Sequence, residues 1–146
     1  LTIAGEVRES DKDFLDIEVF PLIDGKDIRF VGEIGHREKS ILLREADALL
    51  FPSQWNEAFG LVMIEAMACG TPVVALANGA VPEVLVNGKT GFIAGDEGSF
   101  REAARRIDEL SREACREEAE QRFEFLVMAK NYLKAYESIL TGFKAI

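Results

Sequence analysis

The sequence predicts an α/β fold, a parallel sheet with helices on both faces. Short apolar runs of four or five residues alternate with longer segments of helical period, which is typical of parallel strands joined by helical crossovers. The run Pro72–Ala75 is rich in valine, as expected of a strand that is buried on both faces.

Five apolar runs are the expected strands, and glycine or proline closes three of them. Gly5, Gly32 and Pro52 each follow such a run. These residues end strands because glycine adopts turn conformations at little cost and proline lacks a backbone N–H. Strands are therefore expected at Leu1–Ala4, Asp27–Val31, Ala48–Phe51, Pro72–Ala75 and Gly91–Ala94.

The longer segments carry apolar residues at helical spacing. The clearest helix end is at Gly70, where a left-handed residue would close the helix, with Pro72 just beyond it. Parallel sheets bind ligands beyond the carboxyl ends of their strands, so Gly32–Arg37, Ser53–Gly60 and Leu76–Pro82 are the expected binding loops. Helices are expected at Asp11–Leu22, Glu38–Ala46, Gly60–Cys69, Glu97–Leu110 and from Glu113 to about Leu140.

Composition indicates one globular domain and excludes several classes of partner. The chain has 146 residues, of which 48% are apolar, and its formal net charge of -9 argues against binding nucleic acid. No apolar run approaches the ~20 residues that span a bilayer. The start at Leu1 lacks the basic flank of a signal peptide. Cys69 and Cys115 lack metal-ligand spacing, which favours free thiols in a cytoplasmic protein.

The segment after the third expected strand contains a candidate anion site. A helix is expected to open near Gly60, whose missing side chain lets a ligand approach the backbone. The first amides of that helix, on Gly60, Leu61 and Val62, have no acceptor within the helix. Because the positive end of the helix dipole lies behind them, these amides suit a diphosphate.

Two glutamates flank this helix start. Glu57 lies in the loop, and Glu65 lies about five residues into the helix, or ~7–8 Å along its axis. Carboxylates would repel phosphates but accept hydrogen bonds from hydroxyls. The pair therefore suits the two ends of a sugar nucleotide. The alternative for each glutamate is an ordinary solvated acid.

Residues 57–75, which read EAFGLVMIEAMACGTPVVA, identify a family resemblance. The segment resembles the donor-site motif of retaining GT-B glycosyltransferases of family 4, with a glutamate at each end of a seven-residue interval. The resemblance continues through residues 78–84 (NGAVPEV) and 87–92 (NGKTGF) and includes residues 28–32 (IRFVG) and 46–53 (ADALLFPS) upstream. It covers most of residues 1–140 and implies a Rossmann-like sheet, one half of a GT-B fold that lacks its first strand.

The resemblance implies a role for each matching residue. Glu57 is the candidate catalytic residue and would hold hydroxyls of the donor sugar, while Glu65 would hold the ribose hydroxyls. The remaining implied donor-binding positions are the backbone of Phe59, Gly60, Leu61 and Val62 at the diphosphate and sugar, Gly32 and Ile34 at the base, and Lys39 near the nucleotide. No metal ligand and no cofactor besides the nucleoside-diphosphate sugar is expected, since the chain has no Asp-x-Asp pair and no histidine cluster.

The chain departs from the family pattern in what precedes Leu1. In the family, a strand and a basic Lys-Gly element lie ahead of that position, and their Arg and Lys neutralise the leaving diphosphate. An acceptor-binding amino-terminal domain belongs to the same enzymes. We therefore expect residues 1–146 to be the donor-binding domain of a longer two-domain enzyme, inactive alone, with peripheral contact to the inner face of a membrane only through the absent half.

Several alternatives stay open from the sequence. A nucleotide-sugar epimerase of the same architecture would place carboxylates and a histidine around the sugar, and His36 is the only histidine. A non-catalytic module that kept the binding fold is the other alternative. Lys39 can equally be an ordinary exposed lysine. Trp55 is expected to pack against the sheet edge rather than to stack on a sugar or base.

Overall fold

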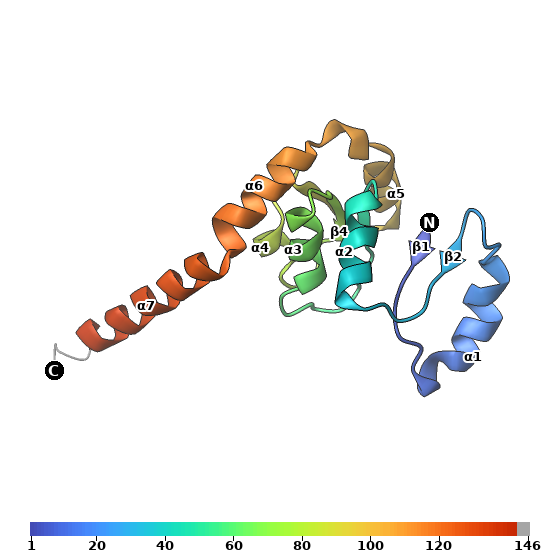
Figure 1. Ribbon diagram of the computed structural model, residues 1–146, viewed down its shortest axis with the longest axis horizontal. Coiled ribbons are helices and arrows are strands. Elements are labelled where there is room, and N and C mark those ends of the chain that lie inside the picture. Colours follow the sequence, from blue (N-terminus) through green and yellow to red (C-terminus); the bar gives the residue numbers. More distant parts are fainter. Residues whose placement is uncertain (143–146) are drawn as a thin grey trace. The chain divides into compact units, whose positions relative to one another are not determined.

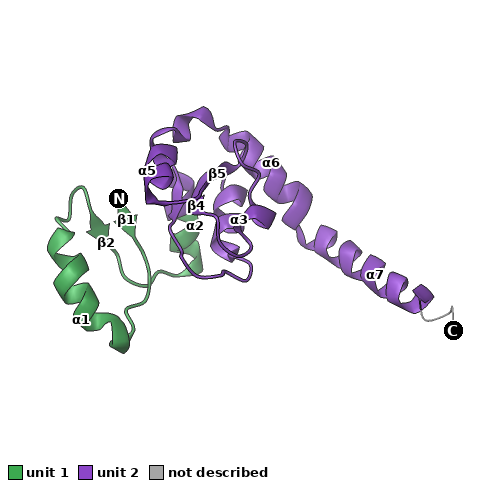
Figure 2. Cartoon of the chain, turned by 180° about the vertical axis from the view of Figure 1, so that it is seen from behind, with its two compact units in different colours: residues 1–41 green, residues 42–146 purple. Residues whose placement is uncertain are grey.

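The computed structural model describes residues 1–142, which fall into two compact units, residues 1–41 and the part of the chain from residue 42 onward (Figure 2). In unit 1, strands β1 (Thr2–Ile3) and β2 (Arg29–Phe30) pair in parallel. The rings of Phe20 and Phe30 pack with their centroids 5.5 Å apart. The first two predicted strands are therefore present, although shorter than expected.

The segment between β1 and β2 is helical but irregular, whereas the sequence predicted a single helix over Asp11–Leu22. It begins with a 3₁₀ turn (Glu9–Asp11) and continues as the short helix α1 (Lys12–Phe14), a π-helical stretch (Leu15–Val19) and a second 3₁₀ turn (Phe20–Leu22). Pro21 contributes to this ending because it has no N–H to continue the helical ladder.

Unit 2 contains a three-stranded parallel sheet in the order β3-β4-β5. Its strands are β3 (Leu49–Phe51), β4 (Val73–Leu76) and β5 (Gly91–Ala94). Val73, Val74 and Ala75 of the central strand are all 0% exposed. Successive side chains of a strand point to opposite faces, so both faces of this sheet are covered, as the sequence predicted.

Helices α3 and α5 pack against the strands of this sheet (Figure 1). Helix α3 packs against β3, β4 and α6, while α5 packs against β4 and β5. The core between them includes Met63, Met67 and Cys115, each 0% exposed. Besides α3 (Leu61–Ala68), the helices are α2 (His36–Glu45), α4 (Val81–Val84), α5 (Glu97–Arg105), α6 (Arg112–Phe123) and α7 (Phe125–Gly142), with a 3₁₀ turn at Ile107–Glu109.

The long helix predicted from Glu113 to about Leu140 is in fact two helices. Glu124 lies between them in an extended conformation, with φ -63° and ψ 142°. Its carbonyl oxygen accepts hydrogen bonds from the amides of Val127 (2.9 Å) and Met128 (3.1 Å), and so begins α7. None of the residues of α7 is buried.

Two arginines fasten α6 to the rest of unit 2. At its start, the guanidinium of Arg112 donates to the carbonyl oxygens of Arg44 and Ala46, both at 2.7 Å. At its end, Arg122 donates to the carbonyl oxygens of Glu83 (2.5 Å) and Val84 (3.1 Å). These bonds satisfy carbonyls at helix ends that lack intrahelical partners.

Among residues 1–142, no helix has both the length and the apolar character needed to cross a membrane.

Candidate functional site

The predicted helix start is present and depends on a left-handed glycine. Gly60 follows the loop after β3 with φ 75° and ψ 57°, and α3 begins at the next residue. The amide of Met63 donates to the carbonyl of Gly60 at 2.9 Å, closing the first turn. A Cβ at position 60 would lie 2.3 Å from Cε of Met63 and 3.3 Å from Cγ of Glu57. Only glycine combines this backbone conformation with this close packing.

The first turn of α3 has the geometry of an anion site. Its leading amides, on Leu61 and Val62, have no acceptor within the helix, and the positive end of the helix dipole lies behind them. Gly60 itself is buried, whereas the side chain of Leu61, the first helical residue, is 66% exposed. The turn can therefore accept a phosphate on its backbone without a cationic side chain.

The carboxylate of Glu57 lies directly before this helix start. The side chain is half-buried, and its Oε1 accepts a long hydrogen bond of 3.4 Å from the amide of Phe59. The amide of Glu57 itself donates to the carbonyl of Trp55 at 2.8 Å. Such a carboxylate is held by its own loop and still has lone pairs for hydroxyl groups.

The loop after β4 holds the Glu57 loop in place. The amide of Ala80 donates to the carbonyl of Glu57 at 2.9 Å, and Nδ2 of Asn78 donates to the carbonyl of Ser53 at 3.0 Å. Both loops are at the carboxyl ends of neighbouring parallel strands, where the sequence placed the binding loops. The matching motifs include these supporting residues, but the sequence predicted no role for them.

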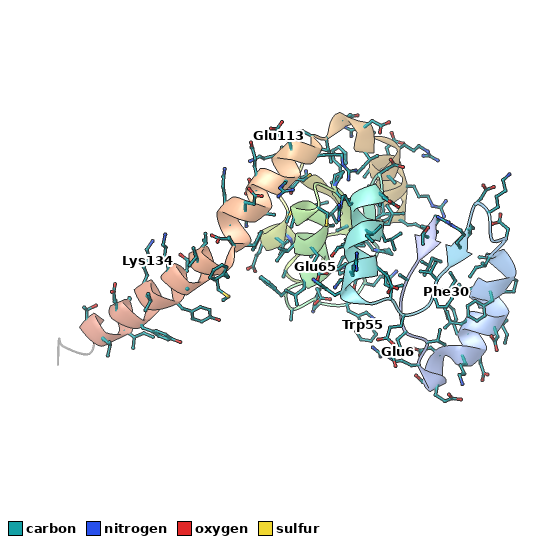
Figure 3. The ribbon with its side chains drawn as sticks, in the orientation of Figure 1. Glu6, Phe30, Trp55, Glu65, Glu113 and Lys134 are labelled. Carbon is teal, nitrogen blue, oxygen red and sulfur yellow. The ribbon has the colours of Figure 1, made fainter. Side chains whose placement is uncertain are left out.

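Glu65 lies on α3 and is half-buried (Figure 3). It is four residues from Leu61, a rise of about 6 Å along the helix. Both glutamates of the predicted pair therefore belong to one loop-helix segment of unit 2. Met63 and Met67, on the same helix, are core residues as expected.

Phe59 and Trp55 have different surroundings in this loop. The Phe59 ring contacts Phe123 of α6 edge to face, with centroids 6.3 Å apart and planes at 77°. The guanidinium of Arg122 lies 4.8 Å from the Phe123 ring centre. The side chain of Phe59 thus fastens the loop to α6. Trp55 is 84% exposed, so the prediction that it packs on the sheet edge is wrong (Figure 3).

The other three predicted donor-binding residues belong to unit 1. Gly32 follows β2 with φ 71°, and its carbonyl accepts a hydrogen bond of 2.9 Å from the amide of Gly5. Ile34 and Lys39 are half-buried. These three residues lie in unit 1, whereas the segment from Glu57 to Glu65 lies in unit 2.

Unit 2 also has an open cavity of about 530 Å³ at the carboxyl ends of β3, β4 and β5. None of the predicted site residues lines it. Asp96 at its rim is the N-cap of α5, where its carboxylate accepts hydrogen bonds from the amide and hydroxyl of Ser99, both at 2.7 Å, which lower the pKa of Asp96. The lining residues are Pro52, Gln54, Leu76, Ala77, Asn78, Gly95, Asp96, Glu97 and Phe100.

Metal-binding side chains do not gather anywhere in residues 1–142: no three of the types His, Cys, Asp and Glu come together in a group that can hold an ion.

Residues 1–124 match the model of the family described as "Glycosyl transferases group 1". The chain belongs to this family. It is similar to the phosphatidyl-myo-inositol mannosyltransferase of Mycobacterium leprae (strain TN), with 36% identity over 122 residues that cover 79% of this chain and 33% of that protein. The chain thus spans about a third or less of the length of the curated relatives it matches.

Solved structures show the same fold. The Anabaena protein Alr3699/HepE in complex with UDP has a TM-score of 0.79 and 23% identity, covering 94% of this chain and 40% of that chain. The sucrose-phosphate synthase of Thermosynechococcus elongatus also has a TM-score of 0.79, with 26% identity, covering 97% of this chain and 39% of that chain. The chain therefore has the parallel α/β fold of GT-B glycosyltransferases.

Proposed function

We propose that residues 1–146 form the donor-binding domain of a retaining glycosyltransferase of family 4, of hexosyltransferase type. The whole enzyme would move a hexose from a nucleoside diphosphate to an acceptor hydroxyl. The acceptor would arrive on the face from which the diphosphate leaves. Family membership and the UDP in the Alr3699/HepE structure support this donor class.

The observation that carries the proposal is the left-handed Gly60 between Glu57 and α3. It places the open amides of the helix start next to a half-buried carboxylate on one short segment. The amides of Gly60 to Val62 would bind the diphosphate and stabilise its charge as it leaves. The carboxylate of Glu57 would hold the sugar hydroxyls, and Glu65 would hold the ribose.

Three residues of unit 1 have proposed roles that come from the family resemblance. The backbone at Gly32 and Ile34 would contact the base, and Lys39 would lie near the nucleotide. An amino-terminal domain would bring the acceptor, and the chain alone would transfer nothing. Catalysis would require no metal, and the enzyme would work in the cytoplasm, with any membrane contact made by the other domain.

Calorimetric titration with UDP, GDP, ADP and their hexose esters tests the proposal. We expect saturable binding of one nucleoside diphosphate and its sugar ester. Glu65→Ala should weaken this binding about tenfold or more, because loss of two hydrogen bonds to the ribose lowers the binding free energy by about 1–3 kcal/mol. Glu113→Ala, on the first turn of α6, is the matched control and should bind normally. Absence of binding to every nucleotide would overturn the proposal.

A further inference from the structure

We propose that Gly79 positions Glu57 and that this position determines how tightly the sugar of the donor binds. The inference rests on the proposed function, because Glu57 must hold the sugar for its position to matter. Gly79 has φ 53° and lies in the loop after β4. A Cβ at this position would lie 2.3 Å from the carbonyl oxygen and 2.4 Å from the amide nitrogen of Glu57.

Contacts this short are with backbone, which cannot swing aside as a flexible side chain can. Any side chain at position 79 must therefore push the peptide units on both sides of Glu57. The direct hydrogen bond from the Ala80 amide to the Glu57 carbonyl, at 2.9 Å, makes the two segments move together. The absence of a side chain at Gly79 thus sets how close the Glu57 loop lies to the end of β4.

The position of Glu57 matters because a hydroxyl-binding carboxylate works only within a narrow range of distance and angle. The Glu57 side chain also contacts the helix start, since a Cβ at Gly60 would be 3.3 Å from its Cγ. A shift of the Glu57 peptide would therefore move the carboxylate relative to the α3 amides. We infer that the shift alters binding of the sugar while the diphosphate still reaches the helix start.

The test compares two glycines that share a left-handed conformation but not a neighbour. Gly88 has φ 77°, and a Cβ there would have nothing within 4 Å. Gly79→Ala and Gly88→Ala therefore bear a similar backbone penalty, but only the first displaces Glu57. Dissociation constants would be measured by calorimetry for the nucleoside diphosphate that the chain binds and for its hexose ester.

Gly79→Ala should weaken binding of the hexose ester about tenfold and change binding of the nucleoside diphosphate by less than about twofold, while Gly88→Ala changes neither. In the Glu57→Ala background, adding Gly79→Ala should cause no further loss, because both substitutions remove the same interaction. Equal weakening of both ligands, equal effects of the two glycine variants, or full additivity with Glu57→Ala would each overturn the inference.

If Gly79→Ala does not fold, Asn78→Ala is used in its place. This substitution removes the 3.0 Å hydrogen bond from Asn78 to the Ser53 carbonyl, a second contact between the loop after β4 and the loop that contains Glu57. It should show the same selective loss, about threefold, and a loss shared by both ligands would count against the inference. A wild-type chain that binds no nucleotide would instead refute the proposed function itself, so the two failures are distinguishable.

Discussion

Helices α3 and α7 are both rich in apolar residues, but they differ completely in burial. In α3, Met63, Ala66 and Met67 are all 0% exposed. In α7, no residue is buried over the whole of Phe125–Gly142. The exposed large apolar residues of α7 are Phe125, Leu126, Met128, Tyr132, Leu133, Tyr136, Ile139 and Leu140, with exposures from 49% to 68%.

The difference shows that position between layers, rather than composition, decides what a helix contributes. Helix α3 lies between strands β3 and β4 and helix α6, so apolar residues around it find partners. Among the described residues, α7 packs mainly with α6, which precedes it. The candidate site is at the start of α3, so the segment proposed to bind the nucleotide rests on the better buried of the two helices.

The largest expected effect is a cavity under α3. Met67→Ala should lower the free energy of unfolding by about 2–5 kcal/mol, because it removes a fully buried side chain from a close-packed core. Leu133→Ala in α7, where the side chain is 61% exposed, should change it by less than about 0.5 kcal/mol. Urea unfolding followed by circular dichroism measures both. A cost above about 1 kcal/mol for Leu133→Ala would break the comparison, because α7 would then be packed in solution.

The second effect tests the turn that opens α3. Gly60→Ala should cost about 1–3 kcal/mol, from the left-handed backbone and from the 2.3 Å approach to Met63 Cε. It should also abolish nucleotide binding by moving the first amides of the helix. Gly142→Ala, in the last turn of α7 with no atom within 4 Å of an added Cβ, should leave stability and binding unchanged. Equal costs for the two substitutions would show that the turn at Gly60 is not strained.

Much of this arrangement could be predicted from the sequence. All five strands lie within a residue or two of their predicted places, because short buried strands combine strong apolar character with clear ends such as Pro52. The start of α3 was also predicted, because Gly60 follows a polar loop and precedes an apolar helix. The structure shows that Gly60 is left-handed, which the residue type allows but does not require.

Other features depend on tertiary contacts that carry no local signal. The break at Glu124 involves neither glycine nor proline, and glutamate is a good helix former. The local sequence therefore gave no sign that α6 and α7 are separate helices. The support of Glu57 by Gly79 depends on a contact between two loops 22 positions apart. The exposure of Trp55 was likewise predicted wrongly, because an aromatic residue in a loop usually finds a packing surface.

A third prediction concerns α6, which contacts both helices compared above and on which Arg122 and Arg116 have contrasting surroundings. Arg122→Ala should cost about 1–3 kcal/mol, because its guanidinium donates to the carbonyls of Glu83 and Val84 and to Glu118. Arg116→Ala removes only an exposed pair with Glu120, 2.8 Å long, and should cost less than about 0.5 kcal/mol. Thermal unfolding at matched salt separates the two, and a similar shift in Tm for both would contradict the anchoring role of Arg122.

The smallest expected effect is a pH dependence from Glu118. Its side chain is 11% exposed. The ammonium of Lys89, 2.6 Å away, lowers the pKa of Glu118 most, burial raises it, and the guanidinium of Arg122, 3.3 Å away, lowers it further. The net result is a pKa below the usual value for a glutamate. A carboxyl whose pKa is lower in the folded state stabilises the fold above its unfolded pKa, and this contribution is lost as the pH falls through the folded pKa.

Glu118→Gln should therefore cost on the order of 1 kcal/mol near pH 7, and the difference from wild type should shrink as the pH falls below about 4. Urea unfolding between pH 3 and pH 7 at constant ionic strength measures this difference, with Glu117→Gln on the exposed face of the same helix as the control for loss of a charge. A difference that stays constant over this range, or grows as the pH falls, would mean that the Lys89 and Arg122 contacts do not hold Glu118 ionised. The network that joins α6 to α4 and to the loop before β5 would then stabilise the fold by packing alone.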